Sequence, residues 1–198
     1  MRISGPRVVL RQWEDADLAV FTAMNADDRV MQFFPKKLSL DESREFLARL
    51  RNGIEERGWG LWAVEIDGEL AGLTGLARPT FEADFTPCTE IGWRFRVKFW
   101  GQGYATEAAR LALLFAFSTL QLEEVVSFTA RINLRSVNVM QRLGMAHDSV
   151  EDFDHPKLPD GHPLQRHVLY RLKNTPETIA RLKAELGTRF GGRIDRVE

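Results

Sequence analysis

The chain has 198 residues, of which 44% are hydrophobic and 28% are charged, and its formal net charge is −1. This composition is typical of a globular protein, and the length suits one domain with a single core. The near-zero charge argues against a nucleic-acid surface. Cys88 is the one cysteine, so an intrachain disulfide is excluded within these residues, and no Cys/His grouping has zinc-site spacing.

The hydropathy pattern also excludes two kinds of segment. No run approaches the roughly 18 apolar residues of a membrane span, and the first residues lack the apolar core of a signal peptide. We therefore expect a cytoplasmic protein with no membrane partner, no nucleic-acid partner and no metal.

The first third of the chain predicts one strand and two helices. Residues 7–12 are β-rich, and the acidic residues that follow precede helical spacing of apolar side chains over 18–24. Ser39 and Glu42 have the spacing of a capping box, which predicts a second helix over 40–54.

An apolar connector, residues 30–35, joins these two helices and contains Phe33 and Phe34. Two interpretations of this aromatic pair stay open. The side chains either pack against the core or form a wall of a substrate pocket.

The middle of the chain predicts an antiparallel meander. Residues 62–66 and 70–76 are β-rich and are joined by Asp67-Gly68, a strong hairpin signal because both turn positions need positive φ. A polar, proline-broken loop follows, and residues 89–97 then alternate like another strand.

This strand leads into a turn with two glycines, Gly101 and Gly103, directly before a helix expected over 105–120. Such a turn leaves several N–H groups pointing outward at a helix start, where the helix dipole adds partial positive charge. The turn therefore predicts a site for a phosphate-bearing ligand. A plain tight turn between strand and helix uses the same residues, so context must decide.

The sequence after this helix predicts a βαβ unit. Residues 124–130 are β-branched and apolar, so strand, glycine turn, helix and strand together indicate a parallel pair within an otherwise antiparallel sheet. A further helix is expected over 133–143 with Gly144 at its end.

The C-terminal part predicts two more strands, 145–153 and 167–172, separated by a long loop over 154–163. A final helix begins at Thr175 and is expected to end at Gly187. Residues 188–198 are expected to be frayed or disordered.

Three motifs in this order resemble the GNAT N-acetyltransferase superfamily and, within it, the RimJ/RimL-like branch. The segment 100–108 (WGQGYATEA) is similar to the acetyl-CoA pyrophosphate loop, 133–145 to the family's Asn-x-x-Ser segment, and 90–93 to the strand beside the pantetheine arm. Trp100 stands where the general loop has Arg or Gln, and Met145 replaces the usual aromatic residue.

The resemblance implies an α/β (α+β) fold, with a mixed, mostly antiparallel central sheet of about seven strands flanked by helices. The acetyltransferase domain would cover residues 1–174, and the helix and flexible tail over 175–198 would be part of that domain or an appendage. Acetyl-CoA would be the co-substrate. The residues expected to bind it are Phe95, Arg96, Val97, Gly101, Gln102, Gly103, Tyr104, Ala105, Thr106, Asn133, Asn138 and Arg142.

Two residues are candidates for proton transfer. Glu90 would be the base for the amine, directly or through water, unless it is a structural strand carboxylate. Ser136 would give a proton to the departing thiolate or bond the cofactor, unless it only caps the helix. Asn133 is either a plain N-cap or a pantetheine contact as well.

The acceptor side is less well marked in the sequence. Its candidate residues are Phe33, Phe34, Trp93 and His155. His162 and His167 share the last loop, and Trp13 and Trp59 either line the acceptor side or belong to the core. Cys88 has no paired histidine and is expected to be buried and inert.

We therefore expect direct transfer of an acetyl group from acetyl-CoA to a primary amine on a peptide or a small molecule. The branch resemblance favours a protein or peptide N-terminus, and small amines and antibiotics are the alternative. A non-catalytic acyl-CoA-binding or sensing module is the rival from another class. A dinucleotide-binding protein is disfavoured because the glycine turn lacks the fingerprint's final glycine. Edge strands are compatible with a homodimer.

Overall fold

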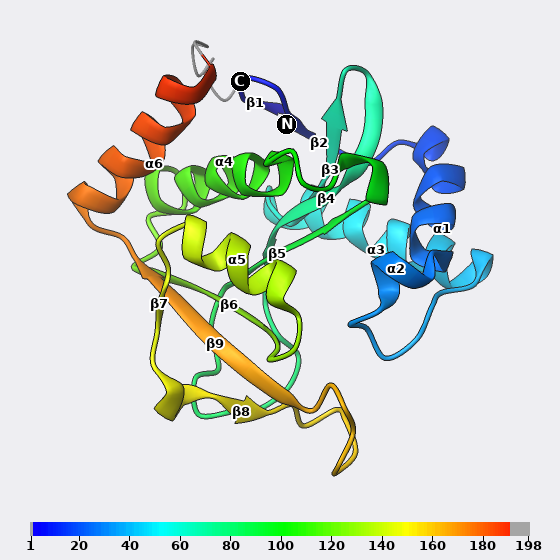
Figure 1. The fold of residues 1–198 in the computed structure, drawn as a ribbon. Coiled ribbons are helices and arrows are strands. Elements are labelled where there is room, and N and C mark those ends of the chain that lie inside the picture. The colour runs from blue at the N-terminus through cyan, green and yellow to red at the C-terminus, as the bar shows by residue number, and fades with distance from the viewer. Residues whose placement is uncertain (1, 191–198) are drawn as a thin grey trace.

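The computed structural model describes residues 2–190, and its centre is one open sheet (Figure 1). Within that part of the chain the sheet has nine strands in the order β1-β2-β3-β4-β5-β6-β9-β7, and β8 pairs with β9. The strands are β1 Arg2–Ser4, β2 Val9–Arg11, β3 Leu61–Ile66, β4 Glu69–Ala77, β5 Glu90–Phe95, β6 Glu124–Ala130, β7 Ala146–His147, β8 Phe153–Asp154 and β9 Arg166–Lys173.

Every neighbouring pair is antiparallel except β5 with β6, which is parallel. The mixed, mostly antiparallel sheet predicted from the sequence is confirmed. The number exceeds seven for two reasons. Strand β1 was not predicted, and the predicted strand 145–153 is divided into β7 and β8 around a 3-10 turn at 149–151.

Six helices flank the sheet in the described residues, and most begin or end where the sequence indicates. They are α1 Leu18–Ala26, α2 Asp28–Met31, α3 Leu40–Arg57, α4 Tyr104–Ser118, α5 Leu134–Arg142 and α6 Pro176–Phe190. The capping box of α3 is confirmed: the Ser39 amide donates to Glu42 Oε2 at 2.8 Å, and the Glu42 amide donates to Ser39 Oγ at 3.2 Å.

The helices form two layers around the sheet. Figure 1 shows α4 and α5 across one side of the sheet and α3 on the far side. Every residue of α4 from 106 to 117 is buried, and Phe115 meets the ring of Trp62 from β3 at 5.3 Å between centroids. On the other side, Phe21 of α1 contacts Phe46 of α3 at 5.6 Å. The core therefore lies on both faces of β3 and β4.

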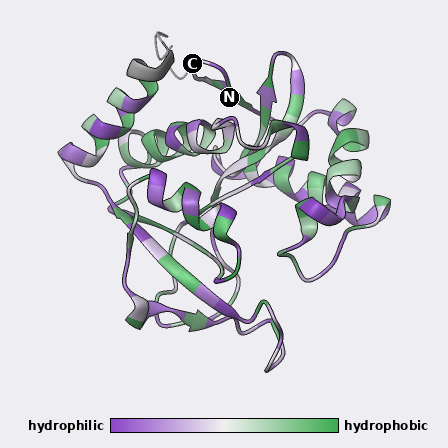
Figure 2. Ribbon diagram, viewed as in Figure 1, coloured by the Kyte–Doolittle hydropathy of each residue, from purple (hydrophilic) through white to green (hydrophobic). Residues whose placement is uncertain are grey.

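Helix α6 packs against α4 and alternates between hydrophobic and hydrophilic segments along its length (Figures 1 and 2). Leu182 and Leu186 are fully buried. The predicted end at Gly187 is wrong, because the helix continues to Phe190. The rest of the tail, residues 191–198, lies outside the described residues. No helix within residues 2–190 is long and apolar enough to cross a membrane.

Candidate active site

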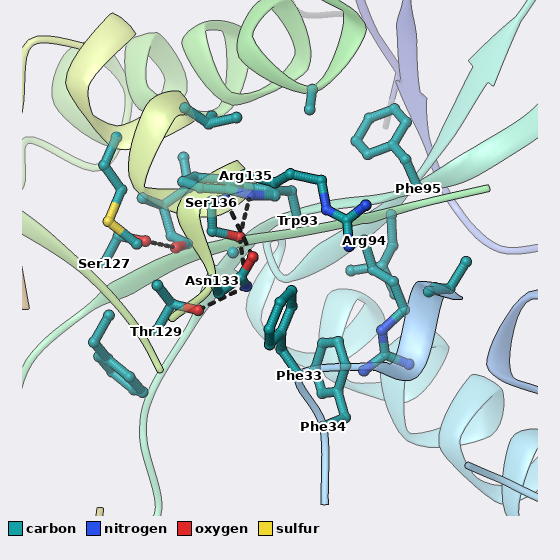
Figure 3. A pocket seen from close by; sticks show the side chains of 18 of the residues that line it. Phe33, Phe34, Trp93, Arg94, Phe95, Ser127, Thr129, Asn133, Arg135 and Ser136 are labelled. Atoms are coloured by element: carbon teal, nitrogen blue, oxygen red, sulfur yellow. Dashed lines mark hydrogen bonds between the residues drawn. The ribbon is translucent and has the colours of Figure 1, made fainter. Parts of the chain in front are cut away.

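A single cavity of about 980 Å³ runs along β5 and joins the glycine turn to the last loop. Figure 3 shows Phe33, Phe34 and Arg94 on one side of it and Ser136, Asn133 and Thr129 on another. Most of the residues expected at the site line this cavity. They are Phe33, Phe34, Glu90, Trp93, Phe95, Gly101, Gln102, Gly103, Tyr104, Ala105, Thr106, Asn133, Ser136, Asn138, Arg142 and His155.

The cavity exists because β5 and β6 diverge. Their parallel pairing is confined to Glu90 opposite Val126. One residue further on, the Ser127 hydroxyl donates to the Ile91 carbonyl at 2.9 Å, and beyond that point no hydrogen bond joins these two described strands. Since backbone groups of successive residues point to opposite edges of a strand, Trp93 presents its N–H and C=O to this opening.

The open edge is therefore only partly where the sequence placed it. The Arg96 amide donates to Ala71 of β4 at 2.9 Å, and Val97 begins a 3-10 turn over 97–99. Neither Arg96 nor Val97 lines the cavity. The prediction of an edge at Arg96 and Val97 is wrong, because β5 ends at Phe95, two residues earlier than its alternating pattern suggests, whereas Phe95 does line the cavity.

The glycine turn has the geometry of an anion site. Gly101 and Gly103 have φ of 75° and 82°, and Gly103 is the N-cap of α4 without a side-chain hydrogen bond. No described residue accepts a hydrogen bond from the amides of residues 101–106; the first helical bond runs from Glu107 N–H to the Gly103 carbonyl at 3.0 Å. Six free donors at the positive end of a helix dipole favour a phosphate group.

Two contacts that sequence reasoning missed hold this turn in place. The buried Glu107 carboxylate accepts from the Arg7 amide at 2.8 Å and from Arg7 Nε at 2.7 Å, and Arg7 Nη1 donates to the Gln102 carbonyl at 3.2 Å. Trp100 Nε1 donates to the Phe95 carbonyl at 2.8 Å. A buried acid in an apolar helix was the available signal for the first contact.

Ser136 lies at the start of α5 in a small polar network (Figure 3). Its Oγ accepts from Asn133 Nδ2 at 3.1 Å and from Trp93 Nε1 at 3.3 Å. These two bonds fill the hydroxyl's lone pairs, so its own proton is left for a group in the cavity. Asn133 is the N-cap, because its Oδ1 accepts from the Ser136 amide at 3.4 Å.

Glu90 is half-buried at the point where β5 and β6 separate. Burial raises the pKa of its carboxyl to about 8, and no described residue gives it a hydrogen bond or an ion pair. A Cβ added to Gly92 would lie 4.0 Å from Glu90 Oε1 and would meet no other atom within 4 Å. Glu90 therefore borders open space large enough for a small group.

Aromatic rings and two histidines line the part of the cavity formed by β6, β9 and the last loop. His155 and His167 both line it, with ring centroids 4.9 Å apart, and Phe128 lies beside them. Burial lowers the pKa of both histidines, which favours their neutral form.

The other residues considered for the acceptor side do not line the cavity. Trp13 and Trp59 are buried in the core, and His162 accepts from the Leu164 amide at 3.1 Å. Cys88 is half-buried, and burial raises the pKa of its thiol to about 11, so it stays protonated at neutral pH.

Comparison with known proteins decides the family. The model of the acetyltransferase (GNAT) domain family matches residues 7–146. The chain belongs to the GNAT acetyltransferase family. Residues 7–146 thus form an acetyl-CoA-dependent N-acetyltransferase domain. The amides of residues 101–106, which line its cavity and have no acceptor among the described residues, are chemically suited to a pyrophosphate.

Three similar proteins illustrate the range of this GNAT family. The FsC-acetyl coenzyme A-N(2)-transacetylase of Aspergillus fumigatus is 38% identical over 137 residues, which is 66% of this chain but 57% of that protein. Spermidine N(1)-acetyltransferase of Escherichia coli K12 is 26% identical over 153 residues, 72% of this chain and 75% of that protein. RimJ of Mycobacterium smegmatis, solved with CoA-disulfide, superposes with a TM-score of 0.72 at 19% identity over 94% and 93% of the two chains.

The last of these likenesses shows the fold alone, so membership of the RimJ/RimL-like branch stays a prediction. Arg94 is among the residues of the GNAT cavity that were not singled out from the sequence. Arg94 lines the cavity from β5, and its guanidinium lies 4.0 Å from the centre of the Phe34 ring. An arginine in an alternating strand pattern is typical of a solvent-exposed side chain. The folded structure is needed to show that Arg94 lines the cavity instead.

Proposed function

We propose that this protein moves the acetyl group of acetyl-CoA directly to a primary amine within the cavity along β5. The observation that carries the proposal is the unpaired carboxyl of Glu90, which borders open space beside Gly92 in the same cavity as the free amides of residues 101–106. A base next to an open position, together with an anion site, is what acetyl transfer from CoA to an amine needs.

The residues of the cavity fit acetyl-CoA, which when bound supplies an acetyl thioester. The amides of 101–106 would hold its pyrophosphate, and the free backbone groups of Trp93 would bond amides of the pantetheine arm as an added strand does. Asn138 and Arg142 line the cavity from α5 and would lie toward the adenosine end. The separation of β5 and β6 leaves this strand edge open for the pantetheine arm.

Glu90 and Ser136 would divide the proton transfers between them. Glu90, in its deprotonated form, would accept the proton that the amine loses when it attacks. Ser136 would donate its free proton to the departing sulfur, which needs limited help because a thiolate is weakly basic. No covalent enzyme intermediate is required, and Cys88, a protonated thiol away from the cavity, is unsuited to forming one.

The acceptor would be either a peptide N-terminus or a small amine. The RimJ/RimL-like motif segments support the first class, whereas the name of the Escherichia relative, a spermidine acetyltransferase, supports a small amine. Both classes require the same chemistry at Glu90, so the proposal for the reaction stands independently of this choice.

The experiment is release of free CoA from acetyl-CoA in the presence of a panel of small amines and short peptides. We expect amine-dependent release by the wild type and strong loss in Glu90→Gln. Both an enzyme and an acyl-CoA-binding module would bind CoA. Only the module would show no amine-dependent release with any acceptor and no effect of Glu90→Gln.

A further inference from the structure

Arg94 is half-buried with an enclosed Nε, and it differs from the two buried arginines in what balances its charge. Arg11 pairs with Asp17 at 2.8 Å and with Glu65 at 2.7 Å, and Arg110 pairs with Glu185. Arg94 forms no ion pair with any residue in the range 2–190. Its Nη1 donates to the neutral Asn25 Oδ1 at 2.6 Å, and its enclosed Nε has no hydrogen-bond partner within that range.

The Arg94 side chain is nevertheless held firmly. Asn25 is fully buried and is itself fixed by a hydrogen bond from its Nδ2 to the buried Ser43 Oγ at 3.2 Å. The guanidinium also stacks on Phe34 (Figure 3). A guanidinium that is fixed, desolvated and without an acid is prepared to bind an anion.

The position of Arg94 on β5 indicates whether the anion that it would bind belongs to the donor or to the acceptor. Because side chains alternate along a strand, Glu90, Gly92 and Arg94 share one face of β5, and Trp93 lies on the other with its indole bonded to Ser136. Arg94 is thus on the side of the base and not on that of Ser136. It is about 7 Å along the strand from the open position at Gly92.

The charges along the cavity agree with an anionic acceptor. Of the described residues that line it, Glu90 is the one acid. Five others are Arg or Lys, but Arg29 is paired with Asp27 and Arg142 lies toward the proposed adenosine end, which leaves Arg94, Arg135 and Lys157. A polyamine would meet these cations without a carboxylate to bind its second charge. An amine with an attached carboxylate would place one group at Glu90 and the other at Arg94.

We propose that Arg94 binds a carboxylate of the acceptor, so that the substrate of this protein is a primary amine that also bears a carboxylate. The inference rests on the proposed function, because it names the acceptor class of the same site. Arg94 would contact the substrate through a charge-assisted, bidentate hydrogen bond and would select against neutral and polycationic amines.

The test compares β-alanine, γ-aminobutyrate and ε-aminocaproate with their neutral amides and with spermidine. For the wild type we expect at least one acid to be used about 10-fold to 100-fold better, in kcat/KM, than its amide, as the loss of a hydrogen bond to a charged group implies. Arg94→Gln should remove this preference by slowing the acid and not the amide. Arg94→Lys, which keeps the charge without the fork, should keep part of it.

The matched control is Arg29→Gln. Arg29 also lines the cavity, but it is exposed and paired with Asp27 at 2.8 Å, so its loss should leave the preference for acids unchanged. Equal use of acid and amide by the wild type, a preference for spermidine, or equal slowing of acid and amide in Arg94→Gln would overturn the inference.

A binding measurement separates this inference from the proposed function. Calorimetry would measure binding of the best of these acids to the protein saturated with CoA, which has no acetyl group to transfer, so no turnover occurs. Binding that is lost in Arg94→Gln supports the carboxylate site even if no amine releases CoA, a result that would refute the proposed function alone. Amine-dependent CoA release without Arg94-dependent binding or preference would refute the carboxylate site alone.

Discussion

At the scale of single residues, the protonation of Glu90 governs what the site can do. A carboxyl that burial holds at a pKa of about 8 is mostly protonated at pH 7, and it becomes a base as the pH rises. The same shift acts on stability. The folded chain binds more protons at Glu90 than the unfolded chain between about pH 4.5 and 8, so this group makes folding less favourable as pH rises through that window.

The first prediction concerns Glu90→Gln. We expect kcat/KM to fall by about 100-fold or more, within the usual range for loss of a general base. In the wild type the rate should increase through pH 8 and then level off, and this limb should vanish in the variant. The measurement is the pH–rate profile of the wild type and of Glu90→Gln with the same acceptor. Because the ionisation of the acceptor affects both profiles equally, the difference between them reports Glu90. Parallel profiles would exclude Glu90 as the base.

A second prediction concerns Ser136→Ala. Because the leaving thiolate is weakly basic, we expect a smaller loss in kcat, on the order of 10-fold, with little change in the KM for acetyl-CoA. Ser136→Thr keeps the hydroxyl and should recover part of the rate. If Thr and Ala variants are equally slow, the residue acts only by supporting Trp93 and Asn133.

Residue roles differed in how well the sequence predicted them. Glu90 and Ser136 belong to motifs with fixed spacing, and the structure brings both to one cavity. Arg94 was missed because its significance depends on Asn25, which is 69 residues away, and on the lack of a carboxylate near it in the fold. Local sequence contains neither fact.

At the scale of elements, the turn before α4 is the feature on which donor binding depends. The turn has two positive-φ glycines, the six amides of residues 101–106 have no acceptor among the described residues, and the helix behind them is buried along most of its length. The sequence predicted this turn well because glycine spacing and helix pattern are local.

The third prediction concerns Gly103→Val. A β-branched residue at φ 82° strains the turn, and its Cβ would lie 3.6 Å from Arg7 Nη2, which holds the turn, so affinity for CoA should fall by about 10-fold or more. Gly161→Val is the matched control, since Gly161 has a similar φ of 79° in the last loop and does not line the cavity. Calorimetry with CoA and thermal melts of both variants would check it. Equal CoA affinity in the two variants would contradict the assignment of the turn.

Elements that depend on distant pairing were predicted less well. The sequence indicated one strand over 145–153, but the chain pairs with β9 at two separate places and forms a 3-10 turn between them. The side chain of Asp148 accepts from the Val150 amide at 3.0 Å and so stabilises this interruption. An alternating pattern alone does not show where the partner strand ends.

At the scale of the whole molecule, contacts between segments that are far apart in the sequence support the site. Arg7 and Glu107 are 100 residues apart and join the start of the chain to the glycine turn. We also propose that α6 is part of the same domain, because Leu182 and Leu186 are fully buried. Sequence patterns did not predict these contacts, because the patterns are local and the contacting residues are far apart in the chain.

The fourth prediction concerns Glu107→Gln. The buried carboxylate accepts two hydrogen bonds from Arg7 and forms an ion pair with it at 2.7 Å, so its neutralisation should reduce the free energy of unfolding by about 1.5–3 kcal/mol. Glu55→Gln, on the exposed side of α3, should change it by less than about 0.5 kcal/mol. Urea unfolding of both variants measures the difference. Equal stability would mean that Arg7 and Glu107 contribute no net energy.

The measurement that tests the account most directly is the initial rate of CoA release while acetyl-CoA and an amine acceptor are varied together. Because one cavity holds both the anion site and the base, the account predicts amine-dependent release with intersecting double-reciprocal lines, as direct transfer in a ternary complex requires. Parallel lines together with an acetyl group left on the protein would contradict direct transfer, and the absence of any amine-dependent release would contradict the proposed function itself.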